Sequence, residues 1–253
     1  MAYYPPTDAN CQAWYRFDSL MGPGGDYSGK DNHLSNYNSV TQSAFSREGS
    51  KSAFIDGTKM LYRTDTNLSA DFPLKYAAGN VLYTGCVWFY STSIGTTQTI
   101  FAKYRQFNGY RTLAFRLASS KACFFAGYSG GNSYETITHG TTLSSNMWYH
   151  ATLTVNATTS AYTLRILDTD LNPVGDDLSG TLANALSIRN EIYTIGAMGN
   201  FAAERFYGYI DDHVVFSRIL DSTDSDAVAA QAFPVVAGGS MPLLHYYNRQ
   251  ARI

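Results

Sequence analysis

About a dozen short runs with the two-residue alternation of β-strands follow one another along this chain, and no long segment with a helical period interrupts them. The predicted strands cover residues 11–18, 52–56, 81–90, 99–104, 111–117, 121–128, 134–139, 148–155, 162–167, 193–196 and 207–216. Turn pairs such as Asp56-Gly57 separate them. So many antiparallel strands must close into a barrel or stack as two sheets to bury one face, and periodicity alone leaves both open.

The residue types support an all-β domain. The chain has 20 Tyr and 14 Phe, and only 15% of its 253 residues are charged. Aromatic residues favour half-buried strands, whereas the usual helix-surface residues Glu and Lys are scarce. We predict one domain over residues 1–221 and a flexible linker and tail over residues 222–253, with a short helical turn at residues 227–233.

Charge and hydropathy exclude several classes of protein. The net charge is -2 and the basic residues do not cluster, which argues against a nucleic-acid partner. No apolar run reaches transmembrane length, and the first residues do not read as a signal peptide. The three cysteines, Cys11, Cys86 and Cys123, lack zinc-site spacing, and Cys86 and Cys123 lie in apolar strand patterns and are predicted to be buried thiols. A disulfide between Cys86 and Cys123 stays open, as an alternative to two thiols.

Eight segments in a fixed order carry a resemblance to a known family. They are WYRFD (14–18), DYSGKDNHL (26–34), GSKSAFIDG (49–57), GCVWFY (85–90), IFAKY (100–104), MWYHATLTVN (147–156), TIGA (194–197) and GYIDDHVVFSRIL (208–220). Over about residues 11–221 the chain resembles the laminin-G-like branch of the concanavalin A-like lectin/glucanase superfamily. The resemblance implies a jelly-roll sandwich of two curved antiparallel sheets.

The resemblance also implies a structural calcium ion. In the family, a loop like the one starting at Asp26 packs near the acidic pair of the penultimate strand. The implied ligands are Asp26, a carbonyl near Asn32, and Asp211 or Asp212, because adjacent strand residues point to opposite faces. The alternative is ordinary turn chemistry in the loop.

Catalytic chemistry is not predicted. Glycosidases of this superfamily need two carboxylates flanking the scissile bond, and none of the four Glu has a carboxylate at the required strand spacing. Asp168 and Asp170 alternate but approach a turn. We therefore expect no enzyme activity, with a glycoside hydrolase as the least favoured reading.

Three loops combine aromatic side chains with Asn and Gly, as sugar-binding and protein-binding surfaces do. They span residues 104–110, 128–134 and 199–207. The candidate ligand-binding residues are Tyr104, Asn108, Tyr110, Tyr128, Asn132, Tyr134, Asn200 and Tyr207. The alternative for each loop is an ordinary hairpin turn. Trp14, Trp88 and Trp148 lie within strand patterns and are predicted to be buried.

Two functional hypotheses follow from these features. The first is a non-catalytic lectin-type module that recognises glycans or a glycosylated surface, as in adhesion. The second is a phage or virion structural protein, such as a capsid decoration or tail adhesin. Residues 240–253 would then be an assembly arm that contacts other subunits. On either hypothesis we expect a protein made in the cytoplasm that acts outside the cell or on a virion surface.

Overall fold

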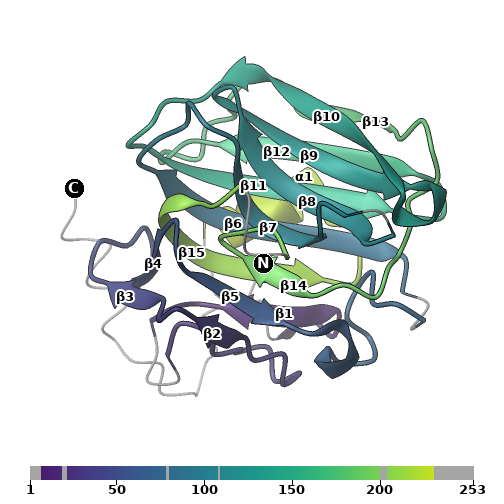
Figure 1. Cartoon of the computed structure of the whole chain (residues 1–253). Helices are drawn as coiled ribbons and strands as arrows, with labels where there is room; N and C mark the ends of the chain where they lie inside the picture. Colours follow the sequence, from purple (N-terminus) through teal and green to yellow (C-terminus); the bar gives the residue numbers. More distant parts are fainter. Residues whose placement is uncertain (1–6, 19–21, 78–79, 108, 200–203, 231–253) are drawn as a thin grey trace.

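Two antiparallel sheets, one of eight strands and one of seven, stack face to face in the computed structural model (Figure 1). The structure describes residues 7–18, 22–77, 80–107, 109–199 and 204–230. The predicted all-β sandwich is thus confirmed, and the barrel alternative is wrong. Within the described residues, no helix is long and apolar enough to span a membrane.

The eight-stranded sheet has the order β13-β12-β11-β6-β15-β4-β3, and β1 pairs with β15 beside this path. Its strands are β1 (Cys11–Tyr15), β3 (Thr41–Ser43), β4 (Ser52–Asp56), β6 (Leu82–Ser91), β11 (Trp148–Asn156), β12 (Ala161–Leu167), β13 (Leu178–Thr181) and β15 (Tyr207–Phe216). The seven-stranded sheet has the order β10-β9-β8-β7-β14-β5-β2. Its strands are β2 (Ser35–Tyr37), β5 (Met60–Arg63), β7 (Gln98–Tyr104), β8 (Arg111–Ala118), β9 (Lys121–Tyr128), β10 (Ser133–Thr142) and β14 (Tyr193–Ile195).

Alternation along β6 and β11 shows how the eight-stranded sheet is buried on both faces. Val87 pairs with Ala151 on the inner face, where both belong to the core between the sheets. Trp88 pairs with His150 on the outer face, and both are also buried. The outer face is therefore covered as well, so nearly every residue of the two strands is buried, including polar ones such as His150 and Thr152.

Helix α1 (Ser222–Ala229) forms part of this cover. Asp221 caps its N-terminus, where the Asp221 side chain accepts a hydrogen bond from Asp224 N. Ser225 Oγ donates to Thr152 Oγ1 at 2.6 Å, and the carbonyl of Ala229 accepts from Trp88 Nε1 at 3.3 Å. The folded unit thus continues beyond residue 221. The helix lies five residues earlier than the predicted turn because its capping aspartate sets its start.

Four strands escaped prediction: β2, β3, β5 and β13. Each has three or four residues, and β2, β3 and β13 contain no buried residue. Such short polar segments lack the alternation that marks a half-buried strand. All three cysteines are buried free thiols, so the open disulfide between Cys86 and Cys123 does not form.

His150 makes the fold sensitive to acid. It is fully buried under the outer cover, its Nδ1 has no hydrogen-bond partner among the described residues, and burial followed by Arg47 and Arg165 lowers its pKa to about 3. In the unfolded chain the His150 imidazole has its ordinary pKa of about 6.5 and binds a proton below that pH, whereas the folded protein keeps it neutral. The free energy of unfolding therefore decreases as the pH falls from 6.5 towards 3. We expect His150→Phe to remove about 2 kcal/mol of the loss between pH 7 and pH 5. Urea unfolding of both proteins at the two pH values measures this, and equal losses would contradict it.

Candidate functional site

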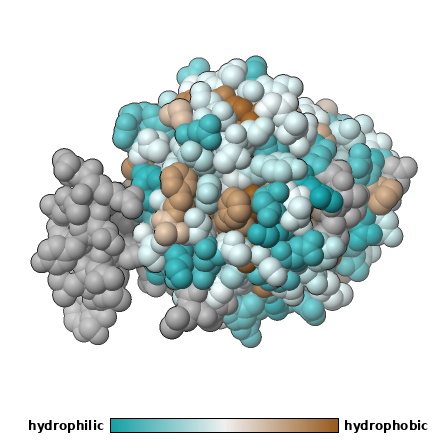
Figure 2. All heavy atoms as spheres, turned by 60° about the vertical axis from the view of Figure 1, so that its left-hand side comes forward, coloured by the Kyte–Doolittle hydropathy of each residue, from teal (hydrophilic) through white to brown (hydrophobic). Residues whose placement is uncertain are grey.

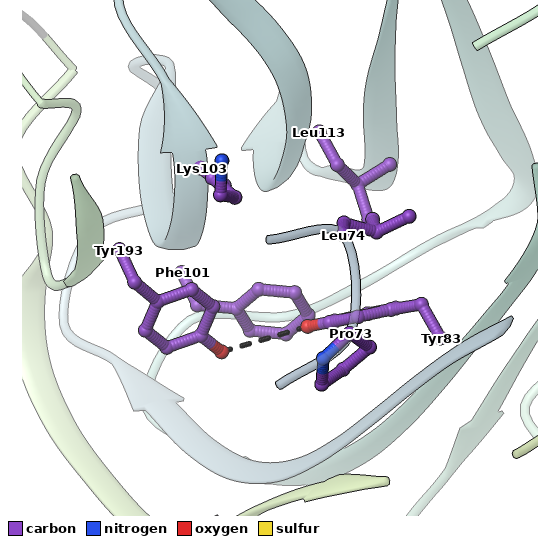
Figure 3. Close-up of a pocket in the computed structure, with 7 residues that line it drawn as sticks. All are labelled: Pro73, Leu74, Tyr83, Phe101, Lys103, Leu113 and Tyr193. Atoms are coloured by element: carbon purple, nitrogen blue, oxygen red, sulfur yellow. Dashed lines mark hydrogen bonds between the residues drawn. The ribbon is translucent and has the colours of Figure 1, made fainter. Parts of the chain in front are cut away.

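The two sheets pack closely against each other in the part of the chain that the structure describes. The cavity drawn in Figure 3 has a volume of about 10 Å³, enough for one water molecule. Tyr83 and Tyr193 bring their hydroxyl groups to 3.5 Å beside it, and Tyr193 hydrogen-bonds His213 Nε2. Since the carbonyl of Cys86 can only accept, His213 Nδ1 donates to it and Nε2 accepts from Tyr193. This cavity is therefore too small for a saccharide, and the candidate ligand site lies on the surface of the described residues.

Tyrosines supply most of the large hydrophobic side chains that are exposed. Tyr37, Tyr76, Tyr110, Tyr134 and Tyr207 make up five of the nine such residues in the described chain. Figure 2 shows one face of the molecule, on which strongly hydrophobic residues lie in separate small patches among polar ones. The face in Figure 2 is thus better suited to amphipathic ligands, which tyrosine can both pack against and hydrogen-bond, than to a large apolar partner.

The structure brings two of the three predicted loops together. Gly109 N donates to the carbonyl of Gly131 at 2.9 Å, which joins the β7–β8 loop to the β9–β10 loop. Gly131 has φ +80, and a Cβ there would lie 3.0 Å from Gly109 C, Arg111 N and Arg189 Cγ. A glycine is needed at this point because the two loops and the segment carrying Arg189 meet there.

Aromatic and arginine side chains gather at this junction. Tyr134 stacks on Phe125 with ring centroids 4.6 Å apart, and Arg111 lies 5.2 Å from the Tyr134 ring centroid. Arg105 lies 5.0 Å from that of Tyr110. Tyr110 and Tyr134 are each 43% exposed. We call this surface the aromatic–arginine patch; it comprises Arg105, Tyr110, Arg111, Phe125, Tyr134 and Arg189.

The other predicted residues of these two loops take supporting positions. Tyr104 is only 1% exposed and packs edge-on against Phe125 and Tyr134, so it holds the patch from below. Tyr128 is half-buried. Asn132 is exposed, and its side chain donates to the carbonyl of Ser129. Asn108 lies outside the described residues.

The described ends of the third predicted loop lie at opposite ends of β7, and Tyr207 lies away from the patch. Gly199 N donates to the carbonyl of Tyr104 at one end of β7, whereas Tyr207 N donates to Gln98 Oε1 at the other end. Tyr207 is 43% exposed and its ring covers Gly57. A hollow of about 250 Å³ includes Gly57 and Arg205 in its wall. Asn200 lies outside the described residues.

The arginines of the patch were missed by the sequence analysis. Arg105 and Arg111 flank the aromatic loop in the sequence YRQFNGYR, which is the signal that could have identified them. Arg189 and Phe125 come from distant segments and carry no such signal.

The predicted calcium ligands Asp26 and Asn32 organise their own loop. Asp26 Oδ1 accepts from Trp14 N and Ser28 N, and its Oδ2 accepts from Ser28 Oγ and Asn32 N, all within 2.9 Å. The Asn32 side chain bonds Gln12 and Ser69. Asp26 therefore already has the four donors that its two oxygens can readily accept.

The acidic pair Asp211 and Asp212 does not alternate as expected. A bulge shifts the β15–β6 register after Asp211, and Asp212 has φ +40. Asp211 accepts from Arg47 N and Glu48 N, and Asp212 from Trp14 Nε1. Both carboxyls thus lie on the outer face, so the expectation that Asp211 and Asp212 point to opposite faces, with one of them reaching an inward site, is wrong.

Burial raises the pKa of Asp212 to about 7, and burial followed by Asp212 raises that of Asp211 well above its usual range. Within the described residues, no group of three or more His, Cys, Asp or Glu is placed to hold a metal ion. The N–H donors occupy the positions that a cation would take, so these residues as arranged do not fit a calcium site. Calcium binding stays a prediction.

The carboxylates considered for catalysis are engaged separately. Asp168 Oδ1 accepts from Asp170 N and Asn172 N at 2.9 Å, which confirms the predicted turn. Glu191 pairs with Arg105, Glu204 with Arg116 and Glu48 with Arg47. Glu135 accepts from the backbone of residues 183 and 184.

Comparison with known proteins gives one family. The model of the family described as the concanavalin A-like lectin/glucanases superfamily matches residues 64–224, more than half of the chain. No curated protein sequence gives a significant match.

Many solved structures share the fold. Domain 4 of AbnA, a GH43 extracellular arabinanase from Geobacillus stearothermophilus, solved with arabinotriose, matches with TM-score 0.62 and 16% identity over 87% of this chain and 98% of that domain. The binding domain of botulinum neurotoxin DC matches in complex with SialylT (TM-score 0.60, 12% identity, 91% and 53% coverage) and with rat synaptotagmin II (TM-score 0.61, 12% identity, 88% and 52%). This chain spans about half the length of that neurotoxin binding domain.

Proposed function

Because this chain belongs to the concanavalin A-like lectin/glucanase superfamily, we propose that it is a non-catalytic binding module that recognises a glycan or a glycosylated surface through the aromatic–arginine patch. The observation that carries this proposal is the meeting of two loops around Tyr110 and Tyr134. Both tyrosines are substantially exposed and flanked by guanidinium groups. Solved structures of the same fold include complexes with arabinotriose and with SialylT, which supports a saccharide ligand.

The patch has the chemistry that sugar recognition needs. A sugar ring has an apolar face that packs on an aromatic ring and hydroxyl groups that need hydrogen-bond partners. Tyr134 and Tyr110 offer the apolar contact and their hydroxyl groups, and the arginines offer N–H donors. Tyr104 and Phe125 beneath them fix the position of Tyr134, so little side-chain freedom remains to be lost on binding.

We expect Tyr134→Ala to weaken glycan binding about tenfold or more, because a buried aromatic contact contributes on the order of 1.5 kcal/mol or more. The matched control is Tyr207→Ala, which removes an equally exposed tyrosine at the far end of β7. A glycan array followed by titration calorimetry measures both. If Tyr207→Ala abolishes binding and Tyr134→Ala does not, the site lies near Gly57 instead.

The virion-assembly hypothesis depends on residues 240–253, which lie outside the described residues. It stays a prediction, as does action outside the cell or on a virion surface. Sedimentation of the full chain and of a chain ending at residue 239 separates the two roles. If the full chain binds glycans but does not sediment with a larger particle, the virion-assembly hypothesis fails and glycan binding remains the proposed function.

A further inference from the structure

We infer that the ligand of the aromatic–arginine patch is an acidic saccharide, one that carries carboxylate or sulfate groups. This inference rests on the proposed function and names its ligand class. It is carried by two arginines, Arg111 and Arg189, whose guanidinium groups are held at the patch without an acidic partner.

Arg111 is fixed by backbone groups alone. Its Nη1 and Nη2 donate to the carbonyls of Asn132 and Gln106, one from each of the two joined loops. Its Nε is buried without a hydrogen-bond partner in the described chain. Carbonyl dipoles position the guanidinium against Tyr134 but leave its full positive charge uncompensated.

Arg189 approaches the same junction from the segment before β14. Its Nε donates to the carbonyl of Gly109 at 3.0 Å, and its backbone N donates to Thr112 Oγ1 at 2.9 Å. A single point, the position of a Cβ on Gly131, lies 3.0 Å from both Arg111 N and Arg189 Cγ. The two arginines are therefore neighbours across the loop junction.

The surrounding cations are neutralised, and these two are not. Lys103 pairs with Asp65, Arg105 with Glu191, and Arg116 with Glu204. Among the described residues, no carboxylate lies within 4.0 Å of the guanidinium of Arg111 or Arg189. A chain with a net charge of -2 thus concentrates two uncompensated positive charges on one small surface.

Guanidinium groups favour this ligand class for a geometric reason. Their planar donors match the oxygens of carboxylate and sulfate, and hydrogen bonds between charged groups are roughly twice as strong as neutral ones. An exposed tyrosine lies beside each charge and can supply the contact for a sugar ring: Tyr134 beside Arg111, and Tyr76 with its ring centroid 6.0 Å from the guanidinium carbon of Arg189. A neutral glycan would use the tyrosines but would leave the charges unpaired.

The test compares neutral, carboxylated and sulfated oligosaccharides of matched length on the full chain, at low and at physiological salt. Arg111→Gln and Arg189→Gln are the variants; Arg189→Gln leaves the bonds from Arg111 to both loops in place. Arg63→Gln is the control, since Arg63 is also held by two carbonyls, those of Asn67 and His33, but lies on β5, three strands from β8. Circular dichroism confirms that each variant is folded.

We expect acidic oligosaccharides to bind more tightly than neutral ones and more weakly as salt rises. Each patch variant should weaken that binding about tenfold, with Arg63→Gln unchanged. The inference would be overturned if neutral glycans bind as tightly as acidic ones, and if Tyr134→Ala weakens this binding while the arginine variants do not. That result would leave the proposed function standing. No binding to any of the three classes would overturn both.

Discussion

Replacing Asp26 by alanine is expected to lower the free energy of unfolding by about 4 kcal/mol. The carboxylate is 5% exposed and accepts four hydrogen bonds, three of them from backbone N–H groups of Trp14, Ser28 and Asn32. Without it these donors stay buried and unsatisfied, which costs far more than the loss of an exposed side chain. Chemical denaturation at pH 7 measures the effect.

Asp170→Ala is the matched control, because Asp170 lies exposed in a turn whose bonds come from its own backbone and from Asp168. Its change in the free energy of unfolding should stay within about 0.5 kcal/mol.

Thermal unfolding of the Asp26→Ala variant tests the predicted calcium ion. The Tm of the unmodified chain is measured once with calcium and once with EDTA. If the Tm is higher with calcium, and Asp26→Ala removes that difference, then Asp26 is a metal ligand and the hydrogen-bonded loop is the metal-free form. An equal Tm in both solutions would leave Asp26 as a structural acceptor.

Replacing Lys103 by methionine is expected to destabilise the fold by about 3–5 kcal/mol. Lys103 and Asp65 are each 3% exposed and lie 2.8 Å apart, and Lys103 also donates to the carbonyl of Arg189. Figure 3 shows Lys103 above the small interior cavity. Its loss leaves the Asp65 carboxylate buried without its cation, in a setting where water cannot replace it. Urea unfolding at pH 7 measures the change.

The double variant Lys103→Met, Asp65→Leu distinguishes the pair from simple packing. When both charges are replaced by apolar groups of similar size, no unpaired charge remains, so we expect most of the lost stability to return. A double variant as unstable as Lys103→Met would instead assign the loss to packing around β7. Lys103 also holds the backbone of Arg189 through its hydrogen bond to the Arg189 carbonyl. Glycan binding by the double variant therefore reports whether the Lys103–Asp65 pair helps to position the aromatic–arginine patch.

The candidate site was only partly readable from the sequence. Loops rich in Tyr, Asn and Gly marked residues 104–110 and 128–134, since such residues combine turn geometry with exposed contact area. The sequence offered no way to rank Tyr104 against Tyr134. A one-residue step along a strand decides which ring faces outward, and the packing of Phe125 decides which ring lies on top.

The acidic pair shows the same limit. Strict alternation assigns Asp211 and Asp212 to opposite faces, but the bulge in β15 turns both to the outer face. Bulges depend on how a strand fits its neighbours, here β6 and β1, and leave little mark on local residue types.

The sequence by itself determined the all-β class, because strand periodicity and turn residues are local properties that recur along the whole chain. The family came from the resemblance carried by eight segments in a fixed order. The sequence also predicted correctly that the three tryptophans, Cys86 and Cys123 are buried. Only the tertiary structure decided that two loops meet at Gly109 and Gly131, that Arg189 joins them, and that Asp26 saturates its oxygens with N–H donors. Each of these depends on contacts between segments far apart in the chain, and such contacts are set by how the two sheets stack rather than by any local pattern.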